Sequence, residues 1–218
     1  MCDFHHDHEL SPLEADEYVL DTPFVRELVR DVRARIDTSA SPTEACEALR
    51  PRFQAALAER DWLPDEFQRD VPDSGMGGGI GQWLLFRSAD RSLCLFSLVV
   101  PPGSKTPIHD HLAWGLVGLY RGNQDEEFYR PHADGIDLVR RRPLEPGDHY
   151  ALLPPVDDVH CVRTTSAETS VSIHLLASDA GCTERHTFDP ATGAPRAFRS
   201  GYANAECEAP PIGAGMDC

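Results

Sequence analysis

From about Gln82 onward the chain divides into short apolar or alternating segments separated by proline, glycine and aspartate. Many short segments of this kind, bounded by turn residues, are typical of an all-β sandwich or barrel. Hairpin turns are expected around Gly122-Asn123, Asp134-Gly135 and Pro146-Gly147-Asp148. The pattern therefore predicts a mainly β fold, with strands at 83–86, 93–100, 108–119, 126–130, 136–140, 149–153, 160–164, 169–176 and 196–199.

Two helices are predicted ahead of this β region. Thr22-Pro23 is an N-cap followed by proline at the first helical position, and apolar residues then recur at helical spacing up to Ile36. Residues 41–44 (SPTE) form a capping-box pattern that opens a second amphipathic stretch reaching Leu57. The glycine-rich run 75–81 lacks the Gly-Lys-Ser/Thr ending of a phosphate loop, so we interpret it as a flexible junction.

These boundaries divide the chain into four parts. We expect a disordered or loosely packed segment over 1–20, a helical elaboration over 21–74, a β barrel over 75–202 and a flexible tail over 203–218. The first part contains a His-rich tract, formed by His5, His6 and His8. Short tracts of this kind can bind a metal weakly.

Composition argues against several classes of partner. The 218 residues include 36 acidic and 20 basic side chains, and the net charge of -16 opposes binding to nucleic acid or an anionic membrane. Residues 1–10 are too polar for a secretory signal, and no apolar run is long enough for a membrane helix, so we expect a soluble cytoplasmic protein. Seven cysteines without a CxxC pair suggest mostly reduced thiols rather than a disulfide framework or a zinc ribbon. The sequence leaves the oligomeric state open.

The segment GSKTPIHDHLAWGLVGLYRG contains the spacing Gly-x5-His-x-His, at Gly103, His109 and His111. In a β-strand, residues two apart point to the same face, so both imidazoles can reach one metal ion while Asp110 points away. Two neutral nitrogen ligands make a partial site for a first-row metal, and such a site needs at least one further ligand. The best candidate for that ligand is His160.

This segment resembles the first metal motif of the cupin superfamily, Gly-x5-His-x-His-x3or4-Glu-x6-Gly. The residues that fall on the motif are Gly103, His109, His111 and Gly122. Gly115 stands where the usual glutamate ligand would be. The segment PLEPGDHYALLPPVDDVHCVRT resembles the second cupin motif, with His160 at the ligand position and Thr164 in place of the trailing asparagine. The resemblance implies a cupin double-stranded β-helix (jelly-roll) barrel, here with an N-terminal helical segment, and a metal held by three histidines.

Three histidines without a carboxylate leave a divalent metal with its full charge and with open positions, which favours an anionic ligand such as a thiolate. In this respect the chain is similar to the thiol dioxygenases, the family of cysteine dioxygenase and 3-mercaptopropionate dioxygenase, over roughly residues 82–202. The resemblance implies Fe(II) as the cofactor, a small thiol and O2 as substrates, and a sulfinate as the product.

Residues downstream of the metal motifs extend this resemblance. The family carries Ser-x-His-x-Tyr beside the metal, and Ser172 and His174 match it, which implies that they order the substrate and oxygen during catalysis. Leu176 replaces the tyrosine, so an apolar wall is expected in place of the phenol. For a substrate carboxylate the resemblance offers two arginines: Arg185, as in the 3-mercaptopropionate branch, and Arg87, as in the cysteine dioxygenase branch. Arg185 is favoured.

Two other functions stay open at this point. Cupin folds host many reactions, so a metalloenzyme of different chemistry, such as carbon-carbon cleavage or isomerisation, is one of them. The other is a metal-binding sensor cupin without turnover, and Leu176 is the feature that favours it. The sequence does not identify the thiol, which can be 3-mercaptopropionate, cysteine, mercaptosuccinate or a bulkier sulfur compound.

Overall fold

The computed structural model of the chain describes residues 10–72, 74–208 and 212. In this part of the chain, a short strand β1 (Glu17–Tyr18), two helices, α1 (Pro23–Thr38) and α2 (Pro42–Ala58), and the 3-10 turn η1 (Asp65–Gln68) come first. The remaining strands are β2 (Gly81–Arg87), β3 (Cys94–Val100), β4 (Gly115–Arg121), β5 (Gln124–His132), β6 (Gly135–Leu144), β7 (His149–Leu152), β8 (His160–Thr164), β9 (Ser170–Leu176), β10 (Arg185–Phe188) and β11 (Pro195–Phe198).

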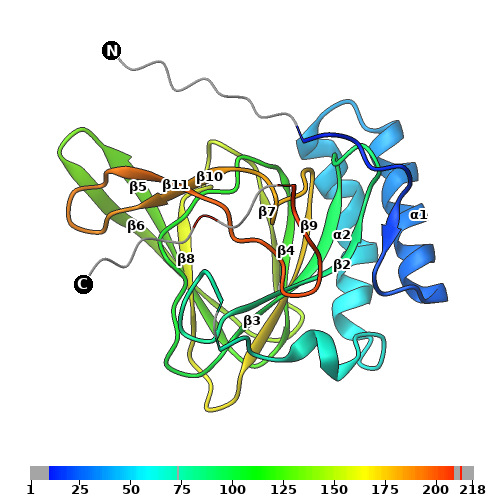
Figure 1. Cartoon of the computed structure of the whole chain (residues 1–218), viewed down its shortest axis with the longest axis horizontal. Helices are drawn as coiled ribbons and strands as arrows, with labels where there is room; N and C mark the ends of the chain where they lie inside the picture. Colours follow the sequence, from blue (N-terminus) through cyan, green and yellow to red (C-terminus); the bar gives the residue numbers. More distant parts are fainter. Residues whose placement is uncertain (1–9, 73, 209–211, 213–218) are drawn as a thin grey trace.

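The strands form a barrel of antiparallel sheets. One sheet has the order β1-β2-β3-β9-β4-β7, a second has the order β6-β5-β8, and β10 pairs with β11. Figure 1 shows the β6-β5-β8 sheet opposite the larger sheet, with both helices against the outer face of the larger one. The predicted fold class is therefore confirmed: a mainly β, double-stranded β-helix barrel with an N-terminal helical segment.

Both helices begin at the predicted capping residues. The side chain of Thr22 accepts a hydrogen bond from the backbone N–H of Val25, and that of Ser41 accepts one from Glu44 at 3.2 Å. Each cap satisfies a backbone donor that the first helical turn leaves free, which stabilises a helix by about 1 kcal/mol. Both helices also carry proline in the first turn, where its missing N–H costs nothing.

The larger sheet separates two apolar clusters. Its outer face packs on the helices, and Gly118 allows α2 to come close, because an added Cβ there would lie 2.4 Å from Leu57 Cδ1. Its inner face packs against the smaller sheet. The larger sheet contributes Phe96, Val117 and Leu119, among others, and the smaller sheet contributes Phe128 and Val162. Side chains alternate between these faces along each strand. On β9 the outer face takes Val171, Ile173 and Leu175, whereas Leu176 belongs to the inner cluster, which gives the inner face the predicted set Ser172, His174 and Leu176.

The strand predicted over 108–119 is wrong in its first half. Residues 108–111 run extended and form only isolated bridges, from His109 to His160 and to Thr187. The backbone then turns away at Leu112, which has a φ of 55°, and regular pairing begins at Gly115. A strand at 185–188 was not predicted, and it lies against the extended segment, where Asp110 N–H donates to His186 O at 3.2 Å.

The turn at Gly122-Asn123 is a corner between sheets and not the predicted hairpin. β4 pairs with β9 and β7, whereas β5 pairs with β6 and β8, so the chain crosses from one sheet to the other at this point. Gly122 adopts a φ of +74°, and a Cβ there would lie 2.8 Å from Ser170 Cα. Glycine is therefore required for both conformation and space. The hairpin predicted at Asp134-Gly135 does join β5 to β6.

Both segments predicted to be loose are tied to the barrel where the structure describes them. β1 pairs with β2, and Leu20 is buried behind it. At the other end, Ala203 N–H donates to Gln82 O at 2.8 Å, and the side chain of Asn204 bonds both backbone groups of Leu84 at 2.9 Å. The expectations of disorder over 1–20 and flexibility over 203–218 are therefore corrected for 17–20 and 203–208. The tract with His5, His6 and His8 lies outside the described residues.

A disulfide bond that the sequence did not suggest joins Cys182 to Cys207. It connects the segment after β9 to the C-terminal segment. Three other cysteines are buried free thiols, as expected: Cys46, Cys94 and Cys161.

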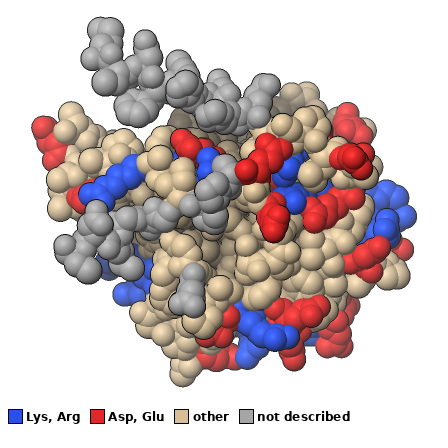
Figure 2. Space-filling model, in the orientation of Figure 1, with Lys and Arg blue, Asp and Glu red and all other residues tan. Residues whose placement is uncertain are grey.

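Charged side chains of both signs share the surface. On the face in Figure 2, the described Lys and Arg side chains lie among Asp and Glu rather than in one continuous basic patch. Several arginines of the described chain form ion pairs, such as Arg163 with Asp125 at 3.0 Å and Arg140 with Asp157 at 2.7 Å. Neither helix of the described chain has the length and apolar character needed to cross a membrane.

Candidate metal centre

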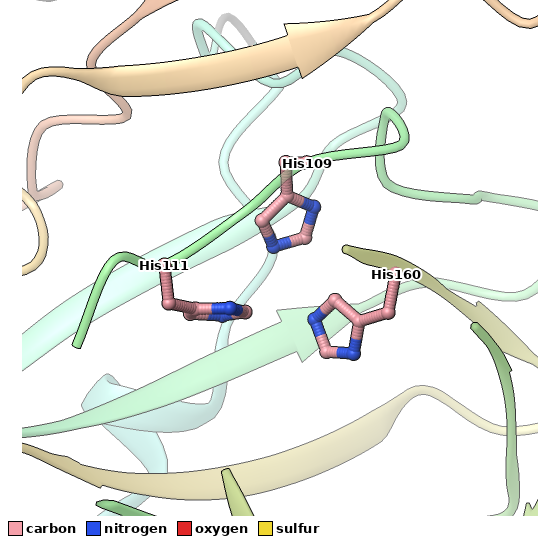
Figure 3. Close-up of side chains that lie close together, drawn as sticks. All are labelled: His109, His111 and His160. Carbon is pink, nitrogen blue, oxygen red and sulfur yellow. The ribbon is translucent and has the colours of Figure 1, made fainter. Parts of the chain in front are cut away.

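Three histidines converge inside the barrel (Figure 3). His109 and His111 lie on the extended segment before β4, and His160 is the first residue of β8. One ring nitrogen from each lies within 4.8 Å of the others, and the three side chains are buried. The structure therefore brings together the three predicted ligands. Two of them are also joined through the backbone, because His109 and His160 donate N–H bonds to each other's carbonyls at 2.9 Å.

The ring nitrogens that face away from the centre have polar neighbours. Nδ1 of His109 lies 2.9 Å from the carbonyl oxygen of Pro107. Because a carbonyl only accepts, Nδ1 carries the hydrogen and Nε2 is left free for a metal. Nδ1 of His160 lies 2.8 Å from Oε2 of Glu126, and its Nε2 is buried without a hydrogen-bond partner. A buried nitrogen with a free lone pair, aimed at two further imidazoles, fits a bound metal ion.

Asp158 fixes the backbone at His111. Its carboxylate accepts the backbone N–H groups of His111 at 2.9 Å and of Leu112 at 3.2 Å. These two bonds support the left-handed conformation at Leu112 that turns the chain out of the centre. Nδ1 of His111 lies 3.5 Å from the same carboxylate. Asp158 therefore fixes the backbone of this ligand directly.

Two rings of the three-histidine cluster favour the uncharged form. Burial lowers the pKa of His109 and of His111 well below the ordinary value of 6.5, and the neighbouring His160 and Arg185 lower it further. Neutral imidazole is the form that coordinates a metal. His109 and His111 can therefore bind a metal at neutral pH without first losing protons.

Gly115, at the usual position of the cupin glutamate ligand, has no room for a side chain. An added Cβ would lie 2.0 Å from the carbonyl oxygen of Leu175 and 2.9 Å from Cα of Leu176. β9 therefore occupies the space through which a carboxylate ligand would have to pass. The close approach of β4 and β9 thus leaves no room for a carboxylate ligand at this position.

Ser172 and His174 form a hydrogen-bonded pair on the inner face of β9. Oγ of Ser172 lies 3.0 Å from Nε2 of His174, and both side chains are buried. The His174 ring stacks on Phe96 with centroids 4.6 Å apart, and its centroid lies 6.5 Å from that of His111. Burial lowers the pKa of His174 to about 3, so the ring is neutral at pH 7. The structure thus brings the predicted Ser172–His174 pair beside the metal centre.

Arg185 is buried next to the same centre without an anionic partner. It donates to the carbonyl oxygen of Asp110 at 2.8 Å and to Oγ of Ser200 at 3.0 Å, and its Nε has no hydrogen-bond partner. Among the described residues, no carboxylate lies within ion-pair distance of it. Burial lowers the pKa of Arg185 to about 10, which leaves it protonated at pH 7. A buried, unpaired cation is costly, so this arrangement favours an anionic ligand.

Arg87 is not brought to the histidines. Its Nε pairs with Glu17 at 2.5 Å, and its Nη1 lies 3.3 Å from Asp179 and donates to the backbone oxygen of Glu206 at 3.1 Å. These contacts connect β1, the segment after β9 and the C-terminal segment. Because two carboxylates already neutralise its charge, we do not retain the prediction that Arg87 binds substrate.

Leu176 is fully buried in the inner cluster. Tyr202 does not substitute for the tyrosine that the resemblance would place at this position. The ring of Tyr202 lies behind Phe96, with centroids 6.2 Å apart. Its hydroxyl donates to Asp179 at 2.8 Å and accepts from Gly181 N–H at 3.0 Å. Tyr202 is therefore committed to the network that contains Arg87.

Two polar residues behind His160 were missed at the sequence level. Glu126 is fully buried on β5, and the hydroxyl of Tyr150 lies 3.3 Å from Nδ1 of His160. Burial, together with the neighbouring Glu126, raises the pKa of Tyr150 well above its ordinary value, so it keeps its hydrogen. The sequence contained one indication of this role for Glu126. It is an acidic residue two positions before Phe128 on β5, so the two side chains point to the same, inward face of the strand.

No protein-family model matches the chain. Its likeness to solved structures is distant. An uncharacterized conserved protein with a double-stranded β-helix domain from Klebsiella pneumoniae has 14% identity and a TM-score of 0.42, over 56% of this chain and 88% of that chain. Peruvianin-I, a cysteine peptidase from Thevetia peruviana latex, has 22% identity and a TM-score of 0.34, over 40% and 52%. The oxalate decarboxylase of Lactobacillus farciminis has 13% identity and a TM-score of 0.34, over 41% and 25%. Similarities of this size do not assign an activity, which has to be argued from the residues of the site.

Proposed function

We propose that this protein is a non-haem Fe(II) thiol dioxygenase that oxidises a small, carboxylate-bearing thiol to its sulfinate with O2. The proposal rests on one observation above all. A buried three-histidine centre without a carboxylate ligand lies beside a buried arginine without a carboxylate partner. A single substrate with a thiolate at one end and a carboxylate at the other would supply both missing negative charges.

His109, His111 and His160 would hold the iron through three neutral nitrogens. Bound Fe(II) supplies the redox chemistry by which both atoms of O2 are added to a sulfur. Because the histidines contribute no charge, the ion keeps its double positive charge and favours a thiolate over a neutral ligand.

Arg185 would bind the substrate carboxylate. Its Nε has a free hydrogen, and its two other nitrogens are already fixed by Asp110 and Ser200, so the guanidinium is held in one orientation before substrate arrives. A planar guanidinium suits a carboxylate better than an ammonium does, because it can offer two parallel N–H groups. Binding at this point would orient the substrate so that its sulfur faces the histidines.

Ser172 and His174 would order the reacting sulfur and oxygen. His174 is neutral, and its stacking on Phe96 and its contact with Ser172 leave the ring little freedom. Hydrogen bonds that are fixed before the reaction stabilise developing charge without a cost of reorganisation. Leu176 adds an apolar wall, which excludes water and tolerates a less polar substrate than a phenol would.

The test is oxygen consumption by protein loaded with Fe(II), measured with a panel of thiols and with product analysis by mass spectrometry. We expect one O2 consumed per sulfinate formed, with a preference for thiols that carry a carboxylate over cysteamine, which has none. His109→Ala should abolish the activity. Protein that contains a full complement of iron and is inert toward every thiol in the panel would refute the proposal.

One observation favours a second candidate, a metal-binding sensor without turnover. Leu176 removes the phenol that the resemblance places beside the reacting atoms. A sensor would bind a thiol at the loaded centre, visible as a change in the absorption spectrum, but would consume no O2. The same oxygen measurement therefore separates the two candidates.

A further inference from the structure

Glu126 is the most unusual charged residue of the barrel interior. Its side chain and that of His160 are both 0% exposed, and Oε2 of Glu126 lies 2.8 Å from Nδ1 of His160. Within the described residues, no lysine or arginine forms an ion pair with it. A buried carboxylate without a cation is strongly unfavourable unless some other positive charge compensates for it.

The 2.8 Å separation determines how His160 is arranged. Two lone pairs at that distance would repel each other, which favours a hydrogen on Nδ1. The contact is a close approach rather than an aligned hydrogen bond, because neither carboxylate oxygen of Glu126 has a hydrogen-bond partner in the described chain. A metal on Nε2 leaves that hydrogen on Nδ1, and the compensating charge for Glu126 is then the metal on the far side of the same ring. A metal held by Nε2 would thus bind one side of the imidazole while Glu126 lies against the other side.

The other two histidines lack this arrangement. Nδ1 of His109 faces a neutral backbone carbonyl, and Nδ1 of His111 lies 3.5 Å from an Asp158 carboxylate that already accepts two backbone N–H groups. Among these three histidines, His160 thus has the closest carboxylate, at 2.8 Å from Nδ1 against 3.5 Å for His111. A carboxylate neighbour increases the basicity of an imidazole, so His160 should be the strongest donor.

We propose that Glu126 is a positioning residue: it orients His160 for the metal and, as an anion behind the ring, strengthens His160 as a donor without becoming a ligand itself. The inference rests on the metal centre of the proposed function but not on its thiol chemistry. Because Glu126 takes no coordination position, the position open to the thiolate of the proposed function is unchanged.

The test is metal binding and does not require turnover. The affinities of metal-free protein for Co(II) and for Zn(II) are measured by competition with a chelator of known affinity. Three variants are compared with the unchanged protein: Glu126→Gln, which keeps the shape and an acceptor but removes the charge; Glu126→Ala, which removes both; and Glu127→Gln as the matched control. Glu127 is the next residue on the same strand, and its carboxylate instead pairs with Lys105 and Arg141 at 2.9 Å.

We expect Co(II) and Zn(II) affinity to fall about 10- to 100-fold in Glu126→Ala and by a smaller factor in Glu126→Gln, with Glu127→Gln within about twofold of the unchanged protein. Metal-free Glu126→Gln should be as thermostable as the unchanged protein or more so, because an uncompensated buried charge has been removed. Unchanged metal affinity in both Glu126 variants would overturn the proposal. So would an equal loss of thermostability with and without metal, or failure of both variants to fold, since either result makes Glu126 a purely structural residue. Metal binding that depends on Glu126, without any thiol oxidation, would refute the proposed function and leave this inference standing.

Discussion

The guanidinium of Arg185 lies 4.7 Å from the centroid of the Phe198 ring, and that ring lies 6.4 Å from the ring of His109. One aromatic side chain therefore neighbours both a buried cation and a predicted metal ligand. Phe198 is on β11 and Arg185 is opposite it on β10, in register. The position of the cation relative to the centre is thus set by a short hairpin whose two strands both contribute to the site.

Replacement of Arg185 by glutamine should weaken the binding of thiols that carry a carboxylate. Loss of a charge-assisted, bidentate contact is expected to lower kcat/KM for 3-mercaptopropionate by about 100-fold, with most of the change in KM. Turnover of cysteamine should change little, because it has no group for Arg185 to bind. Steady-state kinetics with both substrates make the measurement.

Arg87→Gln is the matched control for that experiment. Its ion pairs with Glu17 and Asp179 and its hydrogen bond to Glu206 O connect β1, the segment after β9 and the C-terminal segment, so we expect a lower Tm and an unchanged KM for either thiol. A larger effect on KM from Arg87→Gln than from Arg185→Gln would reverse our assignment of the two arginines.

The stability of the metal-free protein should fall in mild acid, in part because of His174. Burial holds the pKa of His174 near 3 in the folded protein, whereas the unfolded chain binds a proton with the ordinary value of 6.5. The unfolded state therefore gains protons first, and stability is lost as the pH falls below 6.5 until the folded state also protonates. Between pH 7.5 and pH 5.5 this one group should cost about 1.4 kcal/mol. Urea unfolding at both pH values, compared with His174→Gln, measures it; equal pH dependence in the two proteins would contradict the assignment.

Any side chain at Gly115 should destabilise the barrel. Gly115→Ala places a Cβ against the backbone of β9, and we expect a loss of about 3 kcal/mol or more. Gly103→Ala is the control, since a Cβ there meets nothing within 4 Å and only the left-handed backbone, with a φ of +81°, is strained. Its cost should be about 1 kcal/mol. Thermal unfolding of both variants tests the difference in stability. A Gly115→Glu protein that folds and gains metal affinity would contradict the lack of space at this position.

Reduction of the Cys182–Cys207 disulfide should lower stability but leave the metal centre intact. The bond closes a loop with a sequence separation of 25, and loop-closure entropy for this length corresponds to about 3.5 kcal/mol. Urea unfolding with and without a reductant measures the loss, with Cys207→Ser as the genetic equivalent. Zn(II) affinity of the folded, reduced protein should be unchanged; a large decrease would mean that the bond also shapes the site.

Local patterns in the sequence predicted the features that depend on neighbouring residues. The caps at Thr22 and Ser41, the alternation along β9 and the spacing of His109 and His111 are all of this kind. The cupin resemblance added His160, which the barrel brings across to the other two. The predicted strand through His109 and His111 was nevertheless wrong, because two isolated bridges and the turn at Leu112, not regular pairing, hold the ligands on one side.

What the sequence could not predict depends on long-range packing. Glu126 and His160 come together only because β5 and β8 are paired, and nothing in either segment specifies that register. The sequence favoured Arg185 but could not exclude Arg87, because only the folded barrel shows that Glu17 and Asp179 surround it. The lack of space at Gly115 is likewise a property of two strands and not of one.

The paired backbone bonds between His109 and His160 have a further consequence for experiments on this protein. Main-chain hydrogen bonds that do not involve the rings join two of the three histidines, so removal of a bound metal should leave their relative position unchanged. The metal-free centre should keep its geometry, and different metals can then be bound to the same purified protein. Differences measured between such preparations would reflect the ions themselves.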